Sequence, residues 1–411
     1  MNDPNLRAEL EQETPVNPHY YGELDQADPS KVPALIRILD FASEMGASDI
    51  HLCSGAPAMM RLHGDLVRIS EFAEGFDDDF SPKKISDVID GIMNEKIREE
   101  FSRFTEVDFS VNLTSGDRVR VNLFRNIFGV GAVFRIVPSK LPEFDQLGIP
   151  SVMKNVVMKG KGLVLVTGPT GSGKSTTLAA LIDYINASVP MHIITIEDPV
   201  EFVHIPKRCM INQREVGKSA ATFTDALRGA LREDPDVILV GEMRDLETVS
   251  MAITAAETGH LVFGTLHTMS ASKTVDRIIS EFPSDRQTQV RMQLAESLTA
   301  VISQALVPRK DKPGRIAAFE VLISTPAVHN LIRENKTYQI NTVIQTGTHL
   351  GMIGMDQSLM LLVNNGIIDA AEARRWALEP KMFPDRPGSA TRGTYMQRAM
   401  KNQKEAAEAA S

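Results

Sequence analysis

The sequence predicts a mixed α/β protein of two domains, a smaller α+β domain followed by an α/β domain of the nucleotide-binding kind. The chain has 411 residues, which is long for one average domain and suits two. Its first half alternates apolar and polar residues as strands do, whereas its second half contains continuous apolar runs separated by helical stretches. A glycine-rich loop directly follows the first of those runs.

The first 138 residues are expected to contain a tail and the α+β domain. Residues 1–33 are acidic, include five prolines and lack apolar periodicity, so we expect a disordered tail. Residues 34–138 are expected to fold as the N-terminal domain. Its expected elements are a helix from Ala34 that ends at Gly46, strands at 49–52, 59–62 and 66–69, a helix that begins at Ser81-Pro82, and strands at 108–113, 118–125 and 131–137.

A proline-containing linker at 139–160 is expected to lead into the second domain, 161–383. Its apolar runs at 163–166, 193–196, 237–240 and 261–263 predict parallel strands that are buried on both faces. From about Ala295 the pattern is read as mostly helical. Residues 384–411 lack apolar periodicity, and we expect a flexible C-terminal tail there.

The composition argues against several functional classes. Lys and Arg total 44 against 53 Asp and Glu, and a net charge of -9 argues against a nucleic-acid-binding protein. The two cysteines, Cys53 and Cys209, cannot form a disulfide framework or a four-cysteine zinc site, and so few fit the reducing cytoplasm. The first residues lack the features of a signal peptide, and no run of about 18 apolar residues predicts a transmembrane helix.

The strongest motif is a phosphate-binding loop between a strand and a helix. The loop consists of Gly168, Pro169, Thr170, Gly171, Ser172, Gly173, Lys174, Ser175 and Thr176. Its glycines let backbone N–H groups converge on phosphate oxygens, and the helix N-terminus adds positive potential. Lys174 is expected to reach the β- and γ-phosphates of ATP, and Ser175 is expected to ligate Mg²⁺.

Three further polar segments flank predicted strands of the same domain. The acids of 197–201, among them Glu201, follow one strand, and Glu242 follows the next. His260 and His267 flank the strand after that. Because ligands of α/β folds bind at the carboxyl ends of strands, we expect these residues to activate water, hold Mg²⁺ or sense the γ-phosphate.

Each of these segments also has a purely structural interpretation. A single acid after a strand often only caps a helix, and a single histidine at a strand end is more often structural. A glycine-rich turn without a ligand is the corresponding alternative for the loop. The combination with a phosphate loop favours the catalytic interpretation of all three segments.

The order of these motifs resembles the secretion ATPase superfamily, and within it the type IV pilus retraction ATPases of the PilT type. The resemblance extends from Ala34 to Lys381 and includes 46–52, the phosphate loop, 196–201, 239–245 and 259–267. It implies a PAS-like first domain, a RecA-like second domain and a ring of six subunits. It further implies ATP hydrolysis that powers pilus retraction and twitching motility, with a pilus platform protein as partner at the cytoplasmic face of the inner membrane.

The resemblance also assigns roles to individual residues. Glu201 would be the base that activates water, and Glu242 would serve the Mg²⁺ site. Arg120 and Arg135 match arginines that the first domain of the family extends to the γ-phosphate, which is the role of an arginine finger. Taken alone, an arginine in an alternating strand more often lies on a solvated face.

Two features depart from the family pattern. Retraction ATPases carry an Ala-Ile-Arg-Asn-Leu-Ile-Arg-Glu motif, in which this chain has His329 at the first arginine. The tails are the second departure. Alternatives within the class are an accessory retraction ATPase or a type IV secretion ATPase, whereas extension and type II secretion ATPases usually carry a paired CxxC motif. A RecA-like DNA translocase and a non-catalytic nucleotide-binding scaffold are the alternatives outside it.

Overall fold

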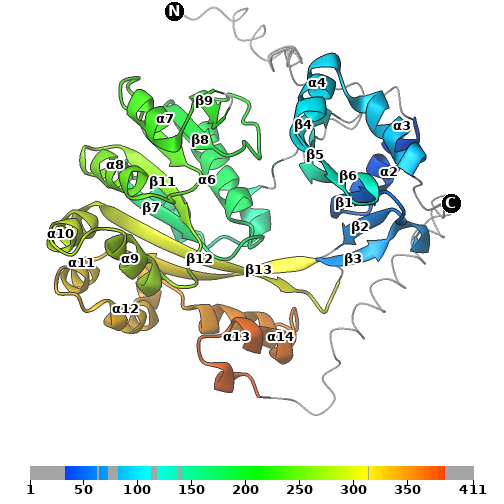
Figure 1. Ribbon diagram of the computed structural model, residues 1–411. Coiled ribbons are helices and arrows are strands. Elements are labelled where there is room, and N and C mark those ends of the chain that lie inside the picture. Colours follow the sequence, from blue (N-terminus) through cyan, green and yellow to red (C-terminus); the bar gives the residue numbers. More distant parts are fainter. Residues whose placement is uncertain are drawn as a thin grey trace, which may run out of the picture. The chain divides into compact units, whose positions relative to one another are not determined.

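The computed structural model describes residues 33–384 except 63, 73–81, 113–117, 138–140, 142, 218 and 313. The chain forms two compact units that divide between Pro138 and Ser139 (Figure 1). The expected tails, apart from Pro33 and Pro384, lie outside the described residues, as do Ser81 and the turn at 113–117. No helix in the described ranges has the length and apolar character needed to cross a membrane.

The first unit is built on one antiparallel six-stranded sheet. Its strands are β1 (Ala47–Cys53), β2 (Met59–Leu62), β3 (Asp65–Arg68), β4 (Glu106–Asn112), β5 (Arg118–Asn126) and β6 (Gly129–Val137). Their order is β3-β2-β1-β6-β5-β4. Because buried and exposed residues alternate along β5, one face of that strand packs against the core. The strands predicted in this region are confirmed, except that Ile69 belongs to a short 3-10 helix and that residue 113 lies outside the described residues.

Helices α2 (Pro33–Glu44), α3 (Pro82–Ile92) and α4 (Glu95–Arg103) pack against β1, β6 and β4 respectively, and the short 3-10 helix η3 spans Ile69–Glu71. The sequence analysis missed α4. This helix buries only Ile97 and Phe101, so its apolar face is narrow. Its start is fixed by Asn94, whose side chain accepts a hydrogen bond from the backbone N–H of Ile97 at 2.8 Å.

The second unit contains a seven-stranded sheet in the order β13-β12-β7-β11-β10-β8-β9. Its strands are β7 (Gly162–Thr167), β8 (His192–Glu197), β9 (Met210–Glu215), β10 (Val237–Val240), β11 (Leu261–Leu266), β12 (Leu298–Pro308) and β13 (Arg315–Ile323). All neighbouring pairs are parallel except β12 and β13. The four apolar runs that predict parallel strands are thus β7, β8, β10 and β11.

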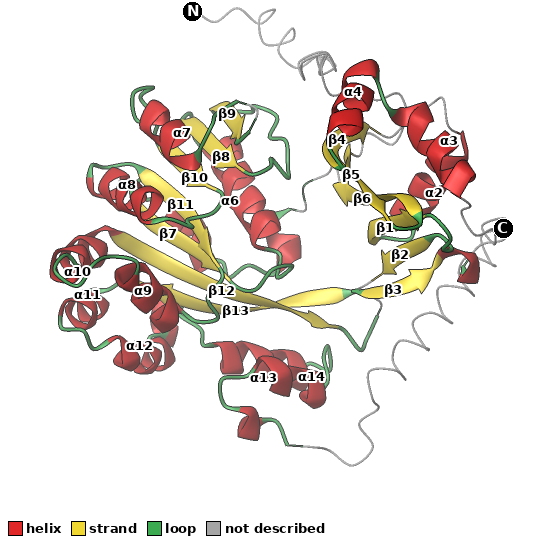
Figure 2. Ribbon diagram, in the orientation of Figure 1, coloured by secondary structure: helices red, strands yellow, loops and turns green. Residues whose placement is uncertain are grey.

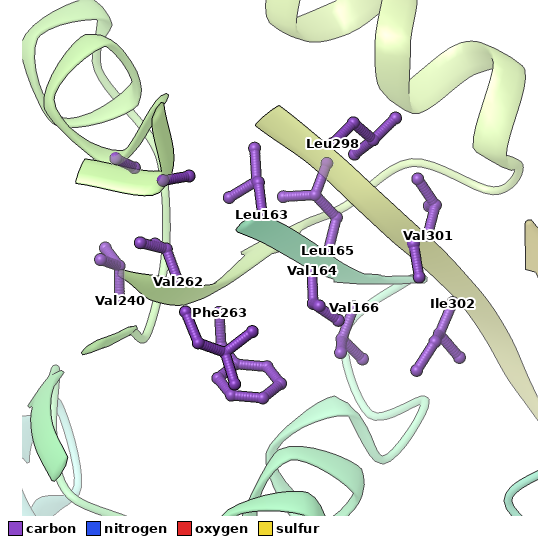
Figure 3. Close-up of a cluster of buried hydrophobic side chains, with 14 of the residues drawn as sticks. Leu163, Val164, Leu165, Val166, Val240, Val262, Phe263, Leu298, Val301 and Ile302 are labelled. Carbon is purple, nitrogen blue, oxygen red and sulfur yellow. The ribbon is translucent and has the colours of Figure 1, made fainter. Parts of the chain in front are cut away.

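The core of this unit lies on the central strands (Figure 3). Every residue of β7, β10 and β11 is buried, which explains why these strands appear in the sequence as continuous apolar runs. Side chains of Val164, Phe263 and Ile302, from three different strands, belong to one cluster. Burial of each such side chain contributes about 1.5–3 kcal/mol.

The helices of the second unit connect and cover these strands (Figure 2). They are α5 (Val152–Val157), α6 (Lys174–Ser188), α7 (Phe223–Ala230), α8 (Leu246–Glu257), α9 (Ala271–Ser280), α10 (Gln287–Ser297), α11 (Pro326–Arg333), α12 (Ile340–Thr346), α13 (Met355–Asn364) and α14 (Ala370–Trp376). Short 3-10 helices are η4 (Phe144–Leu147), η5 (Thr337–Gln339), η6 (Thr348–Leu350) and η7 (Pro380–Met382).

The expectation of a mostly helical region from Ala295 was wrong for two segments. Residues 298–308 and 315–323 form the paired strands β12 and β13. Most of β12 is buried, so it lacks the alternation that marks a half-exposed strand. Glu320 on β13 is 2% exposed and accepts the backbone N–H of Ala271, at the start of α9, at 2.7 Å.

The segment expected to be a linker also contains structure. Helix α5 lies within residues 139–160, and its side chains Met153, Val156 and Val157 belong to the core of the second unit. Six residues are too few to show a clear helical periodicity of apolar residues. The prolines around them therefore led to the prediction of a linker.

Candidate nucleotide-binding site

The glycine-rich loop connects the end of β7 to the start of α6, where the sequence predicts it. Gly168, Gly171 and Gly173 have φ of +142°, +76° and +89°, in a region that residues with a β-carbon rarely adopt. A β-carbon at Gly168 would lie 2.3 Å from the backbone oxygen of Gln304, and one at Gly173 would lie 3.0 Å from Nε2 of that residue. Two of the glycines are therefore needed because the loop packs against β12.

Lys174 is the first residue of α6, and its side chain turns back toward the loop. Its Nζ donates to the backbone oxygens of Gly168 at 2.9 Å and Pro169 at 3.1 Å, and it lies 3.5 Å from Nδ1 of His267. The remaining loop residues Thr170, Ser175 and Thr176 are at least partly accessible to solvent. An ammonium group beside a helix N-terminus is a suitable partner for a phosphate.

Glu242 is separated from the end of β10 by Gly241 and pairs with two side chains. Its Oε2 lies 2.7 Å from Nη2 of Arg244, and its Oε1 lies 3.1 Å from Nε2 of His267. The hydrogen bond from Arg244 lowers the pKa of Glu242, and the positive charges of Arg244 and His267 act in the same direction against burial. Burial lowers the pKa of Lys174, and the negative charges of Glu242 and Glu201 oppose that shift.

Glu201 lies in the loop after β8 with an exposed side chain, and its charge acts on Lys174. The carboxyl group of Glu197 supports this loop from β8. It accepts hydrogen bonds from Oγ1 of Thr195 at 2.7 Å and from the backbone N–H of Glu201. Burial raises the pKa of Glu197, and these hydrogen bonds partly oppose the shift. The backbone of Glu201 is therefore held by a group beneath it.

Gln213 on β9 holds the next part of the same loop. Its Nε2 donates to the backbone oxygen of Phe202 at 2.9 Å, and its Oε1 accepts the backbone N–H of His204 at 2.7 Å. These two hydrogen bonds satisfy backbone groups in the way that a neighbouring strand would, so they fix the backbone conformation of the residues that follow Glu201.

The two histidines that flank β11 do not come together. His267 follows the last residue of β11 and contacts Glu242 and Lys174, whereas His260 precedes its first residue. Nδ1 of His260 lies 2.9 Å from the backbone oxygen of Ala255. Because β11 is parallel to β7, His260 lies at the edge of the sheet opposite to the phosphate loop. The structure therefore does not bring His260 to the phosphate loop beside His267.

Arg120 and Arg135 belong to the first unit and lie directly opposite each other on β5 and β6. Nε of Arg135 donates to Oδ1 of Asp49 at 2.8 Å, and the arginine side chain stays 63% exposed. Because paired residues of adjacent strands project from the same face, the two arginines place two positive charges on one face of the sheet.

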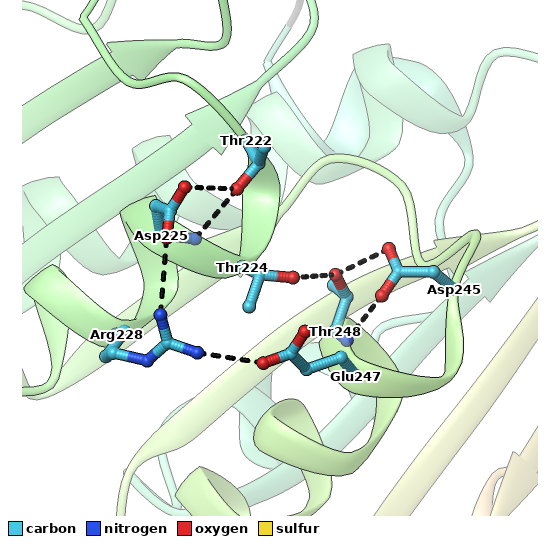
Figure 4. Close-up of polar contacts among 7 residues, drawn as sticks. All are labelled: Thr222, Thr224, Asp225, Arg228, Asp245, Glu247 and Thr248. Carbon is cyan, nitrogen blue, oxygen red and sulfur yellow. Dashed lines mark hydrogen bonds and ion pairs between the residues drawn. The ribbon is translucent and has the colours of Figure 1, made fainter.

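A polar network fixes the segment that follows β10 (Figure 4). Asp245 caps α8 by accepting the backbone N–H and the hydroxyl of Thr248, both at 2.8 Å. Thr248 Oγ1 lies 3.2 Å from Oγ1 of Thr224 on α7, and Arg228 of α7 lies 2.8 Å from Glu247 of α8. These contacts join α7 to the first turn of α8 and give the loop between β10 and α8 a fixed end.

The residues at this edge of the sheet fit a nucleotide with Mg²⁺. Lys174 provides a cation beside the N-terminus of α6, and the positive-φ glycines leave backbone N–H groups free of side-chain cover. The hydroxyl of Ser175 and the carboxylate of Glu242 are oxygen donors of the kind that Mg²⁺ prefers.

Sequence reasoning missed the polar residues beneath the loop. Ser303 and Gln304 on β12 are 0% and 2% exposed. Oγ of Ser303 lies 2.8 Å from Oγ1 of Thr167, and Nε2 of Gln304 donates to the backbone oxygen of Ser172 at 2.5 Å. The sequence does contain an indication of this contact, because Ser303 and Gln304 interrupt the apolar run 300–307. Buried polar groups require hydrogen-bond partners, so two such residues in a buried strand indicate a polar contact.

Comparisons with known proteins identify the family of this chain. The family model described as "Type II/IV secretion system protein" matches residues 105–312. The Pseudomonas aeruginosa "Type IV pilus retractation ATPase PilT" is 52% identical over 85% of this chain and 99% of its own length. The Neisseria gonorrhoeae "Twitching motility protein" is 51% identical over 84% of this chain and 90% of its own length.

A solved structure supports the same assignment. The crystal structure of the pilus retraction motor PilT with bound ADP has a TM-score of 0.75 and 45% identity, and the match covers 85% of this chain and 98% of that one. The mixed α/β fold is therefore that of a nucleotide-binding ATPase. The chain belongs to the type IV pilus retraction ATPases of the type II/IV secretion system family and is an ATP-hydrolysing motor protein.

Proposed function

We propose that this chain acts as a homohexameric ring that couples ATP hydrolysis to retraction of a type IV pilus. The observation that carries this proposal is the contact of Lys174 and Glu242 with the same imidazole, His267, beside the phosphate loop. These three groups lie beyond the carboxyl ends of β7, β10 and β11 and contact one another, so the charge of a bound phosphate would act on all of them. The names of the relatives support pilus retraction as the work performed.

The proposed roles follow from the chemistry of each group. Lys174 and the N-terminus of α6 bind the phosphates of ATP. Mg²⁺, held by Ser175 and Glu242, would neutralise phosphate charge when bound. Glu201 accepts the proton of the attacking water, a role that suits an exposed carboxylate whose backbone is held by Glu197. His267 orients Glu242 through their hydrogen bond.

The first unit would act on the nucleotide through its arginines. In this proposal a PAS-like domain of residues 34–138 presents Arg120 and Arg135 to the γ-phosphate, and residues 139–160 contain the hinge. Two cations on one face of a sheet suit a group that spreads negative charge over three oxygens. Loss of the γ-phosphate on hydrolysis would release that contact, which is a switch of the kind seen in other nucleotide-driven proteins.

The proposed partner is the pilus platform protein, at the cytoplasmic face of the inner membrane. Residues 161–383 form the RecA-like domain in this proposal, with its helical C-terminal part continuing beyond β13.

The segment around His329 lies on α11. Burial and the charge of Arg333 lower the pKa of His329, against the charge of Glu296, so the neutral imidazole is favoured, whereas the arginine of the family motif is a fixed cation.

The test is deletion of the gene in its own host, complemented with wild type or with Lys174→Gln. Retraction predicts that the deletion strain keeps surface pili, or accumulates them, and loses twitching motility. Wild type should restore motility, and Lys174→Gln should not. A strain that loses its surface pili would contradict retraction and favour an assembly motor.

A further inference from the structure

A buried glutamine on β12 contacts the phosphate loop from behind. Strand β12 runs parallel to β7, and Ser303 lies opposite Thr167, the last residue before the loop. The next residue, Gln304, is 2% exposed, and its Nε2 donates to the backbone oxygen of Ser172. Ser172 itself is 3% exposed, so this hydrogen bond is shielded from solvent and contributes more than it would in water.

This hydrogen bond has a geometric consequence for the next N–H group. The peptide bond between Ser172 and Gly173 is trans, since the one cis bond in the described chain is Asp198-Pro199. In a trans peptide the carbonyl oxygen and the N–H point in opposite directions from one rigid plane. With the oxygen of Ser172 directed at Gln304 on β12, the N–H of Gly173 is directed away from β12.

The glycines of the loop show how closely it packs against this residue. A β-carbon at Gly168 would come within 2.3 Å of the backbone oxygen of Gln304, and one at Gly173 within 3.0 Å of its Nε2. A β-carbon at Gly171 would meet nothing within 4 Å. Two of the three glycines thus make room for Gln304, and the third lies on the open side of the loop.

The side-chain amide of Gln304 acts only as a hydrogen-bond donor within the described chain. Oε1 of Gln304 and Oγ of Ser172 are buried, and neither has a hydrogen-bond partner within the described chain. The carbonyl of Ser172 can only accept, so Nε2 must face it, and the buried Oε1 without a partner is a destabilising cost of this arrangement. An apolar residue of the same size would avoid that cost but would leave the carbonyl of Ser172 without a donor.

We propose that Gln304 is a positioning residue that fixes the Ser172–Gly173 peptide plane so that the N–H of Gly173 faces the nucleotide phosphates. Without this donor the peptide can rotate and present the carbonyl of Ser172, with its partial negative charge, to the phosphates. The proposal deepens the nucleotide-binding part of the proposed function and does not depend on pilus retraction.

The test uses the full-length protein with Gln304→Met, which keeps the volume and removes the donor. The Kd for Mg-ADP is measured by calorimetry. Loss of one N–H contact to a charged phosphate predicts binding weaker by about 10- to 100-fold for Gln304→Met. The KM for ATP should rise, while kcat at saturating ATP stays within about threefold.

A second measurement does not depend on nucleotide. Hydrogen exchange of the segment 168–173 in the nucleotide-free protein should be faster in Gln304→Met than in wild type, because the loop loses its support. The matched control is Ser303→Ala, which removes the neighbouring buried hydrogen bond to Thr167 but leaves the peptide plane in place. It should bind ADP within about twofold of wild type, because a packing defect alone does not rotate the peptide.

A folded Gln304→Met protein with wild-type Kd and wild-type exchange in this segment would overturn the proposal. The same holds if Ser303→Ala weakens ADP binding as much as Gln304→Met does. If Gln304→Met does not fold, Gln304→Asn, which keeps the amide but shortens its reach, decides by the same two measurements. A defect in pilus retraction with normal ADP binding would concern the proposed function and not this residue.

Discussion

Nε2 of His267 lies 3.1 Å from Oε1 of Glu242, and this contact joins the loops after two adjacent strands, β11 and β10. The other ring nitrogen of His267 lies 3.5 Å from Nζ of Lys174, so the imidazole stands between an acid and a cation. The negative charge of a phosphate bound at Lys174 would therefore also act on Glu242, because the His267 side chain contacts both groups. His260, at the other end of β11, has no part in this arrangement.

The first prediction separates the two histidines. His267→Ala should lower kcat for ATP hydrolysis by about 10- to 100-fold, because Glu242 loses an orienting hydrogen bond to a charged group. His260→Ala should leave kcat unchanged and cost about 1 kcal/mol of stability through the lost contact with Ala255. Steady-state hydrolysis and thermal unfolding of both variants provide the check. Equal losses of kcat would return His260 to the catalytic set.

The second prediction concerns Lys174. Lys174→Gln should weaken ATP binding by roughly 100-fold, since a charge-assisted contact to phosphate is lost. Because burial lowers the pKa of Lys174, its charge does not stabilise the fold, and the Tm should not fall. Lys161→Gln, at an exposed position before β7, is the control and should bind ATP normally. A large drop in Tm for Lys174→Gln would show that the lysine is structural.

The third prediction tests the proposed base. Glu201→Gln should lower the hydrolysis rate by about 10²- to 10⁴-fold, the range for loss of a general base, while the Kd for ATP stays close to that of wild type. Single-turnover hydrolysis and equilibrium binding measure the two quantities. Glu257→Gln, on the exposed side of α8, is expected to behave as wild type. Normal turnover in Glu201→Gln would remove this residue from the mechanism.

The fourth prediction is a pH dependence of stability. His204 is 7% exposed, and burial lowers its pKa to about 4, with Asp183 opposing the shift and Lys207 adding to it. The folded state thus holds the neutral form, whereas the unfolded chain takes up a proton near pH 6.5. Stability from this group is complete above about pH 6.5 and is lost as the pH falls toward 4.

The measurement is urea unfolding of wild type and His204→Gln at pH 8 and pH 5. The difference in the free energy of unfolding, wild type minus variant, should fall by about 2 kcal/mol between these pH values. His349→Gln, at an exposed site, is the control for loss of an imidazole that is not buried. A constant difference for His204→Gln would mean that the buried imidazole is already charged or hydrated.

The sequence predicts the central strands and the phosphate loop because each has a strong local signal. The fully buried β7 and the loop at Gly168 are examples, since an apolar run and a glycine pattern need no tertiary information. Helix α5 and strand β12 could not be predicted in this way. The short α5 has too few residues for a period, and β12 owes its conformation to β7 and β13 on its two sides.

The site shows the same limit. Lys174, Glu242 and His267 follow strands whose carboxyl ends meet, so sequence order alone brings them together. His260 has the same residue type and a similar neighbourhood in sequence, and only the direction of β11 separates it from the site. Gln304 lies 130 positions beyond Lys174, and its role depends on the register between β12 and β7.

The sheet order determines where this polypeptide can be shortened. The family model ends at residue 312, yet β13 begins at Arg315 and pairs with β12 along residues 300–308. A chain cut at 312 would leave β12 as a bare edge, open to pairing with other molecules. It would also lack Glu320, the acceptor for the first turn of α9. The smallest self-sufficient motor fragment must therefore extend past Ile323, and aggregation of shorter fragments would reflect an unpaired strand and not a failed active site.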